Sequence, residues 1–267
     1  MARKRIICIR QPELADEEWA LLAPHLPEPR ASARAGPRPV PNRPVVEGIL
    51  WILRNGARWR AMPEGFPAPA TDLRVRGRRH LGRRPAGLPR RARRPDAAAM
   101  GRVLRRWVLR PGEEGGGGVG PTKKGKGTKW MLVVDGDGVP LACHLDSARP
   151  SEVERTLDNV SIKRRRDGTT PRPRLLILDR AYESDPLRDR LAARGIEMVC
   201  PHRRNRRRPA TQRAGRLRRY YRRRWRVERT FAWLGNFRRL LVRHERTPRM
   251  YRAFFHLACM LITMRPL

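Results

Sequence analysis

Hydrophobic and polar positions recur with two different periods along the second half of this chain. Four short apolar runs have the length of strands: residues 129–134 (KWMLVV), 139–145 (VPLACHL), 175–178 (LLIL) and 196–200 (IEMVC). The turn sequence DGDG joins the first two runs as a hairpin. Three longer segments have helical spacing: residues 151–160, 185–194 and 251–264. This order predicts a mixed α/β fold built around one sheet.

Two further apolar stretches with helical spacing lie near the amino terminus. The first begins at Asp16, a residue suited to cap a helix, and continues to Leu26. The second is Val45–Leu53 (VVEGILWIL), and a linker rich in Pro and Arg separates the two. Short helices joined by a basic linker resemble a helix-turn-helix-like module. Residues 1–70 are therefore predicted to form a small helical domain that binds DNA.

Residues 71–118 follow neither period. Arg, Pro, Gly and Ala dominate, and only Ala97–Leu109 has the composition of a helix. Such a segment cannot bury enough apolar surface to offset the conformational entropy lost on ordering. It is predicted to be irregular, either as a disordered basic arm that coats phosphates or as the out-of-frame product of a GC-rich gene. The contrast with the ordered flanks favours the second interpretation.

The segment Tyr220–Leu241 (YYRRRWRVERTFAWLGNFRRLL) is predicted to be an amphipathic helix with a single acid, Glu228, at the edge of its apolar face. Tyr221 and Arg224 precede Glu228 at helical spacing. A surface ion pair with Arg224 is the simplest role for Glu228. Asp179 supplies a second acid, because it follows a buried strand at the edge where α/β sheets bind ligands. A helix cap would equally explain Asp179 on its own.

Together, Asp179 and Glu228 are candidate ligands of a divalent metal ion. Hard cations such as Mg²⁺ bind a few carboxylates together with water and phosphate oxygens. Two such ions about 4 Å apart can activate a water or a 3′-hydroxyl and stabilise the leaving oxygen of a phosphodiester. The pair therefore indicates metal-dependent phosphodiester chemistry.

The charge of the chain points to a polyanionic partner. Lys and Arg number 62 against 25 acids, which gives a net charge of +37. Nucleic acid is the expected partner and an anionic membrane surface the alternative, although the longest apolar run, residues 253–264, is too short to span a bilayer. Four widely spaced cysteines and no secretory signal predict reduced thiols and a cytoplasmic, nucleoid-associated protein.

Several phrases resemble insertion-sequence transposases of the DDE class: GTKWMLVVDGDGVPLACHLDSA, LLILDRAYESDPLRDRLAARGIEMVCPHRRNRR and YYRRRWRVERTFAWLGNFRRLLVRHE. The amino-terminal ELADEEWALLAPHLP and VVEGILWILRNGARWRAMPEGF resemble the helical domain of that group. The resemblance covers residues 12–70 and 116–267. It implies a ribonuclease H-like core over residues 119–267 and three acids that bind two Mg²⁺ or Mn²⁺ ions. It also implies strand cleavage and transfer at terminal inverted repeats of double-stranded DNA, by a homodimer in the DNA complex.

In this resemblance, Asp179 matches the family's second Asp and Glu228 its Glu. Tyr221 and Arg224 match the start of the Tyr-Arg-Glu-Lys signature, whose Lys falls on Gly235 here. Arg238 or Arg239 is expected to replace that phosphate contact. The predicted DNA-binding residues are Tyr221, Arg224, Arg203, Arg204, Arg206, Arg238 and Arg239.

The family's first Asp has no counterpart in this chain. Its strand falls where Arg105, Arg106 and Trp107 stand, and Asp135 is better explained by the hairpin turn. The missing acid coincides with the irregular segment, as a pair of compensating frameshifts would produce. We therefore expect that this copy has lost the first edge strand with one metal ligand and cleaves DNA little or not at all. If the alternative frame of the gene encodes no strand ending in Asp, the frameshift hypothesis fails.

Two other functions are open from the sequence. A non-catalytic DNA-binding remnant or regulator of transposition would need the basic residues and not the acids. A ribonuclease H-like nuclease that hydrolyses DNA without strand transfer would need both.

Overall fold

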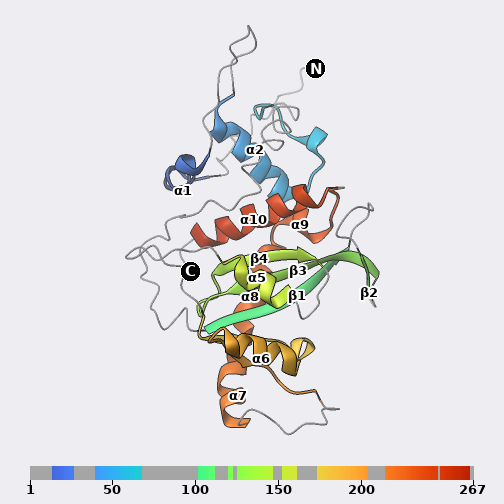
Figure 1. Cartoon of the computed structure of the whole chain (residues 1–267). Helices are drawn as coiled ribbons and strands as arrows, with labels where there is room; N and C mark the ends of the chain where they lie inside the picture. Colours follow the sequence, from blue (N-terminus) through green and yellow to red (C-terminus); the bar gives the residue numbers. More distant parts are fainter. Residues whose placement is uncertain are drawn as a thin grey trace, which may run out of the picture.

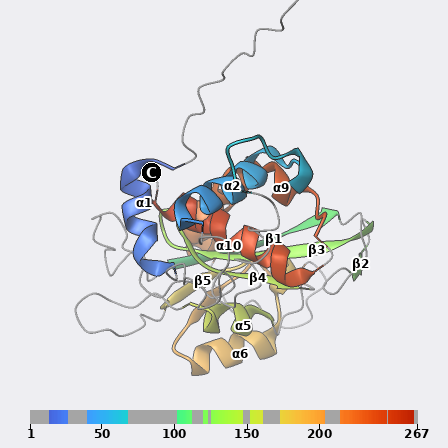
Figure 2. The ribbon, with the colours of Figure 1, turned by 90° about the horizontal axis from the view of Figure 1, so that it is seen from above.

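The computed structural model describes residues 14–26, 40–67, 102–111, 120–122, 125–146, 152–160, 173–203, 214–245 and 247–264. Within these ranges, a six-stranded sheet carries helices on both faces (Figure 1; Figure 2), which confirms the predicted mixed α/β fold. None of the described helices has both the length and the apolar character needed to cross a membrane.

The sheet is mixed, with β1 at its centre. Its strands are β1 (Arg102–Pro111), β2 (Gly120–Thr122), β3 (Gly125–Val134), β4 (Pro140–Asp146), β5 (Leu175–Ile177) and β6 (Glu197–Val199). β1 pairs antiparallel with β3 and parallel with β5. β2 and β4 pair antiparallel with β3, and β6 extends the sheet in parallel beyond β5. Each of the four predicted strands is present, and DGDG forms the turn between β3 and β4.

β1 corrects two predictions for the segment of residues 71–118. The prediction of an irregular segment is wrong for residues 102–111, which form a strand, and residues 102–109 therefore do not form the helix that the composition of Ala97–Leu109 allows. The expected loss of the sheet's first strand is also wrong, since β1 lies between β3 and β5 and not at an edge. The physical reason is that ladder pairing uses backbone groups, and the Val and Trp residues of RVLRRWVLRP favour extended backbone. Residues 71–101 and 112–118 lie outside the described ranges.

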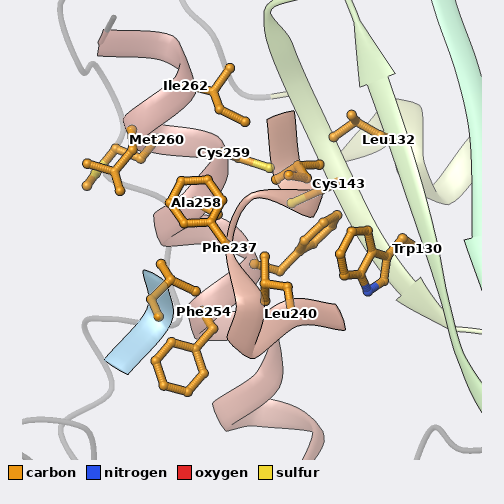
Figure 3. Close-up of a cluster of buried hydrophobic side chains, with 14 of the residues drawn as sticks. Trp130, Leu132, Cys143, Phe237, Leu240, Phe254, Ala258, Cys259, Met260 and Ile262 are labelled. Atoms are coloured by element: carbon orange, nitrogen blue, oxygen red, sulfur yellow. The ribbon is translucent and has the colours of Figure 1, made fainter. Parts of the chain in front are cut away.

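Apolar side chains on both faces of the sheet account for the two helical layers. Val133 of β3 is buried with α5 (Glu152–Asp158) and α6 (Asp185–Ala193) on one face. Its neighbours Trp130, Leu132 and Val134 are buried on the other face, with α8 (Trp225–Gly235), α9 (Arg238–Leu241) and α10 (Pro248–Met264). Figure 3 shows Trp130 and Leu132 on the strand and Phe237, Leu240 and Phe254 among the helices. The alternation follows from the two-residue period of a strand.

The amino-terminal helices pack on the outside of the second helical layer (Figure 2). They are α1 (Asp16–Leu22), the 3₁₀ turn η1 (Ala23–His25), α2 (Asn42–Asn55) and the 3₁₀ turn η2 (Trp59–Ala61). Their buried side chains belong to the same hydrophobic cluster as α8 and α10, and Trp59 stacks on Phe254 with ring centroids 5.8 Å apart. The helices are thus present as predicted, while their DNA-binding role stays a prediction.

The predicted cap of α1 is wrong. Ala15 occupies the N-cap position, and Asp16 is the first helical residue. The Glu18 carboxylate accepts a hydrogen bond from the Ala15 amide at 3.1 Å. Asp16 instead forms an ion pair with Arg43 at 2.6 Å, which joins α1 to α2.

The apolar spacing predicts one helix over Tyr220–Leu241. The structure instead has a helix that is interrupted twice. α7 (Ala214–Tyr221) passes through the 3₁₀ turn η4 (Arg222–Arg224) into α8, and α8 ends at Gly235. Phe237 is extended and buried before α9 begins, so its burial sets the second break. Tight 3₁₀ turns inside helical stretches often mark functional positions. η4 carries Arg224 at such a break.

Candidate active site

Asp179 lies at the carboxyl edge of the sheet, directly after β5. Leu178 still pairs with Val199 of β6, and Asp179 has extended backbone with φ −74° and ψ 155°. Its Oδ1 accepts a hydrogen bond from the Arg180 amide at 2.7 Å, so Asp179 caps the 3₁₀ turn η3 (Arg180–Tyr182). Capping fixes the carboxylate at the strand end and leaves it 29% exposed.

Arg224 connects Asp179 to Glu228, the acid in the first turn of α8. Its Nη1 lies 3.2 Å from Asp179 Oδ1, and its Nη2 lies 3.0 Å from Glu228 Oε1. The ion pair between Arg224 and Glu228 that the helical spacing predicts is therefore present. Arg224 also pairs with Asp179, the acid at the end of the strand. The structure thus brings together residues separated by about fifty positions in the chain into one half-buried cluster.

Tyr221 completes this cluster from the end of α7. Arg224 Nη1 donates to the Tyr221 hydroxyl at 2.7 Å, and that hydroxyl lies 3.4 Å from Asp179 Oδ1. Burial, with the nearby Asp179 charge, raises the pKa of Tyr221 above its ordinary value. The phenol therefore stays protonated at neutral pH and can donate to the carboxylate.

Three side chains that the sequence analysis did not identify hold the loop carrying Asp179. Cys200 Sγ donates to the Asp179 carbonyl at 3.2 Å, and burial raises the pKa of this thiol to about 12, which keeps it protonated. His202 Nδ1 lies 2.9 Å from Glu183 Oε1, and both side chains are largely buried. The order of the strands could have identified these residues. β5 and β6 are parallel neighbours, so the residues that follow each strand meet at one edge of the sheet.

The hairpin turn after β3 supports α8 from the opposite side. Asp135 Oδ1 accepts hydrogen bonds from the amides of Asp137 and Val139, each at 2.9 Å, which confirms its predicted turn role. Thr230 of α8 donates to the Gly138 carbonyl at 2.5 Å. Gly138 has φ +87°, and a Cβ there would meet Thr230 Oγ1 at 3.1 Å. The turn therefore requires glycine and fixes the helix that presents Glu228.

The register of the sheet identifies the position opposite Asp179 on β1. Leu104 is the partner of Ile177, and continuing the parallel register by two residues brings Arg106 beside Asp179. Arg106 is also the partner of Leu132, whose side chain is buried on the α8 face of the sheet. Residues opposite each other in neighbouring strands share a face. By this register, position 106 of β1 belongs to the face of the sheet that α8 covers. The described residues contain no group of three or more His, Cys, Asp or Glu suited to a metal.

The other predicted DNA contacts divide into three groups. Arg203 and Arg238 are exposed, and Arg203 also reaches the Ala181 carbonyl at 3.3 Å. Arg239 is a correction: its guanidinium is buried, pairs with Glu245 at 2.8 Å and donates to the carbonyls of residues 56 and 57. It joins α9 to the end of α2 and has no surface to offer DNA. Arg204 and Arg206 lie outside the described residues.

Comparison with known proteins identifies the family of this chain. The family described as "Transposase DDE domain" matches residues 71–263, and the family "Putative transposase of IS4/5 family" matches residues 14–83. A putative transposase for insertion sequence element IS402 of Burkholderia cepacia is 39% identical over 150 residues, which are 54% of this chain and 67% of that protein. An uncharacterized 16.2 kDa protein of the same element is 44% identical over 55 residues, 20% of this chain and 37% of that protein.

Among solved structures, a cryo-EM structure of the piggyBac transposase synaptic complex with hairpin DNA covers 94% of this chain and 70% of its own, at a TM-score of 0.49 and 11% identity. The family assignment rests on the sequence matches, of which the "Transposase DDE domain" covers residues 71–263. This chain therefore belongs to the DDE-domain transposases of insertion sequences.

Proposed function

We propose that this protein is an insertion-sequence transposase that binds the terminal inverted repeats of its element, as a homodimer on the DNA. Its core is ribonuclease H-like and serves metal-dependent strand cleavage and transfer, which are impaired in this copy. The observation that carries the proposal is the meeting of Asp179 and Glu228 at the carboxyl edge of the sheet. The antiparallel strands on one side of β1 and the parallel strands on the other support the ribonuclease H-like arrangement.

The side chains present fit one divalent ion better than two. Asp179 and Glu228 offer carboxylate oxygens, and Mg²⁺ or Mn²⁺ accepts one or two carboxylates with water and substrate phosphate as its remaining ligands. When bound, such an ion supplies a polarised water or 3′-hydroxyl and stabilises the leaving oxygen of a phosphodiester. A second ion would draw on a third carboxylate, and we assign that position to Arg106, which the continued register of β1 and β5 brings opposite Asp179. This substitution is the physical basis for the proposed impairment.

The remaining residues of the cluster would bind DNA and orient the metal-binding carboxylate. Arg224 and the protonated Tyr221 hold the Asp179 carboxylate, and both side chains keep part of their surface in contact with solvent, where a DNA phosphate can reach them. Arg203, after β6, and Arg238, at the start of α9, are exposed and suit phosphate contacts. The net charge of +37 supplies general attraction to the DNA backbone.

A non-catalytic DNA-binding remnant or regulator is the second candidate. The arginine at position 106 favours this second candidate. A chain that has lost a metal ligand would lose cleavage but would keep the basic surface that binds DNA. The two candidates share DNA binding and differ only in cleavage, so DNA binding is the first property to measure.

We expect the purified chain to bind a duplex carrying the inverted repeats that flank its gene. Because arginines act by displacing counterions, the affinity should fall by about a thousandfold or more between 50 and 200 mM salt. Fluorescence anisotropy across this range measures the slope. Arg203→Gln and Arg238→Gln should each reduce the slope by about one phosphate contact.

Arg190→Gln is the matched control, because Arg190 of α6 is already paired with Glu154 of α5 at 2.9 Å. Its slope should equal that of the unsubstituted chain. Asp179→Ala should bind DNA at least as tightly as the unsubstituted chain, since it removes a negative charge. An affinity insensitive to salt would contradict the proposed DNA contacts.

A further inference from the structure

Arg224 occupies the position of a counter-ion between the two acids of the site. Its two terminal nitrogens contact separate carboxylates, at 3.2 Å to Asp179 and 3.0 Å to Glu228. The three side chains are between 29% and 36% exposed, so the pairs are shielded from solvent only in part. A single guanidinium thus pairs with the same carboxylates that the proposed function assigns to a divalent cation.

A guanidinium in this position opposes metal binding in two ways. It uses lone pairs of Asp179 Oδ1, which already accepts from the Arg180 amide, and of Glu228 Oε1. Its positive charge also repels a divalent cation at the same carboxylates, and at a few ångströms this repulsion is large compared with thermal energy. Tight metal binding therefore requires Arg224 to leave at least one acid.

DNA offers Arg224 an alternative partner. A phosphate accepts two hydrogen bonds from one guanidinium and carries a full negative charge, so it competes well with a half-exposed carboxylate. Arg224 stands in η4, at the junction of α7 and α8, and its side chain remains accessible. Rotation of this side chain alone can exchange one anion for another without movement of the sheet.

We propose that Arg224 exchanges partners, from the Asp179 and Glu228 carboxylates in the free protein to a DNA phosphate in the complex, and so couples cation binding to DNA binding. The proposal rests on the proposed function, since it requires that the protein bind both a divalent cation and DNA. This exchange restricts tight binding of the metal ion to protein that has already bound DNA. By thermodynamic reciprocity, the cation then tightens DNA binding by the same factor.

The test is the affinity of the full chain for Mn²⁺, measured by electron paramagnetic resonance with and without a short DNA duplex, after subtraction of the Mn²⁺ that the duplex binds alone. Without DNA, Arg224→Gln should bind Mn²⁺ about tenfold more tightly than the unsubstituted chain, a typical size for coupled sites. DNA should tighten Mn²⁺ binding to the unsubstituted chain by a similar factor and leave Arg224→Gln within about twofold.

Two further variants separate charge from position. Arg222→Gln removes the same charge from the same 3₁₀ turn at an exposed residue, and it should behave as the unsubstituted chain does. Arg224→Lys keeps the charge but replaces the two-pronged guanidinium with one ammonium, so its Mn²⁺ affinity without DNA should be intermediate. Circular dichroism confirms that each variant is folded.

The outcomes distinguish this proposal from the proposed function. If Asp179→Asn binds Mn²⁺ as tightly as the unsubstituted chain, or if no variant binds DNA, the proposed function fails and the exchange fails with it. If Mn²⁺ binding depends on Asp179 and DNA binds, but Arg224→Gln and the unsubstituted chain respond alike, only the exchange is overturned.

Discussion

Arg106→Asp should increase the affinity of the chain for Mn²⁺ by at least about tenfold, because it replaces a positive charge beside Asp179 with a third carboxylate. The register carries this expectation: position 106 is opposite Leu132 on the face that α8 covers and, by continuation from the Leu104–Ile177 pair, beside Asp179. Electron paramagnetic resonance of Mn²⁺ measures the affinity directly, without any need for cleavage.

Arg105→Asp is the matched control for this result. It makes the same change in charge one residue away, at the position paired with Val133, which is buried on the opposite face of the sheet. Because successive positions of a strand belong to opposite faces of the sheet, position 105 belongs to the face that α8 does not cover. Equal gains in Mn²⁺ affinity for the two variants would show that the gain is general electrostatics and that the register argument is wrong.

Glu245→Ala should lower the free energy of unfolding by about 3–5 kcal/mol, the loss expected when a buried charge is deprived of its partner. Glu245 pairs with Arg239 at 2.8 Å, and the two side chains are only 5% and 7% exposed. Arg239 also donates to the carbonyls of residues 56 and 57, at the carboxyl end of α2. The loss therefore weakens the contact between the amino-terminal helices and the core, and urea denaturation measures it.

Glu154→Ala is the control for Glu245→Ala. Glu154 pairs with Arg190 at a similar distance, 2.9 Å, but the arginine is 48% exposed, so water replaces the lost partner. Its cost should stay below about 1 kcal/mol. Should both substitutions cost the same, the Arg239–Glu245 pair would not be the buried connection described above.

Sequence periodicity predicted most of the fold, and it identified Asp179 and Glu228, which the structure brings together through Arg224. Buried strands ending at Asp179 and at Cys200, and the amphipathic spacing around Glu228, depend on local patterns that a single sequence displays. The turn role of Asp135 followed from the same local chemistry. The bridging position of Arg224 did not, because an i,i+4 pair with Glu228 leaves open whether the guanidinium also reaches Asp179.

Long-range pairing explains what sequence periodicity missed. β1 lacks a clear apolar alternation and is defined by backbone pairing with β3 and β5, which no local pattern encodes. Arg239 appears equivalent to Arg238 in the sequence, yet contact with α2, more than 180 residues away, buries one and leaves the other exposed. The break at η4 likewise could not be predicted, because a run of arginines is compatible with both an α-helix and a 3₁₀ turn.

We propose a DDE transposase site that retains Asp179 and Glu228 and lacks its third acid. Nicking of a terminal-repeat duplex in the presence of Mn²⁺ tests this claim most directly, with the unsubstituted chain, Arg106→Asp, and Arg106→Asp combined with Asp179→Asn. We predict no nicking above background by the unsubstituted chain, nicking by Arg106→Asp, and its loss in the combined variant. Robust nicking by the unsubstituted chain that disappears with Asp179→Asn would contradict the account.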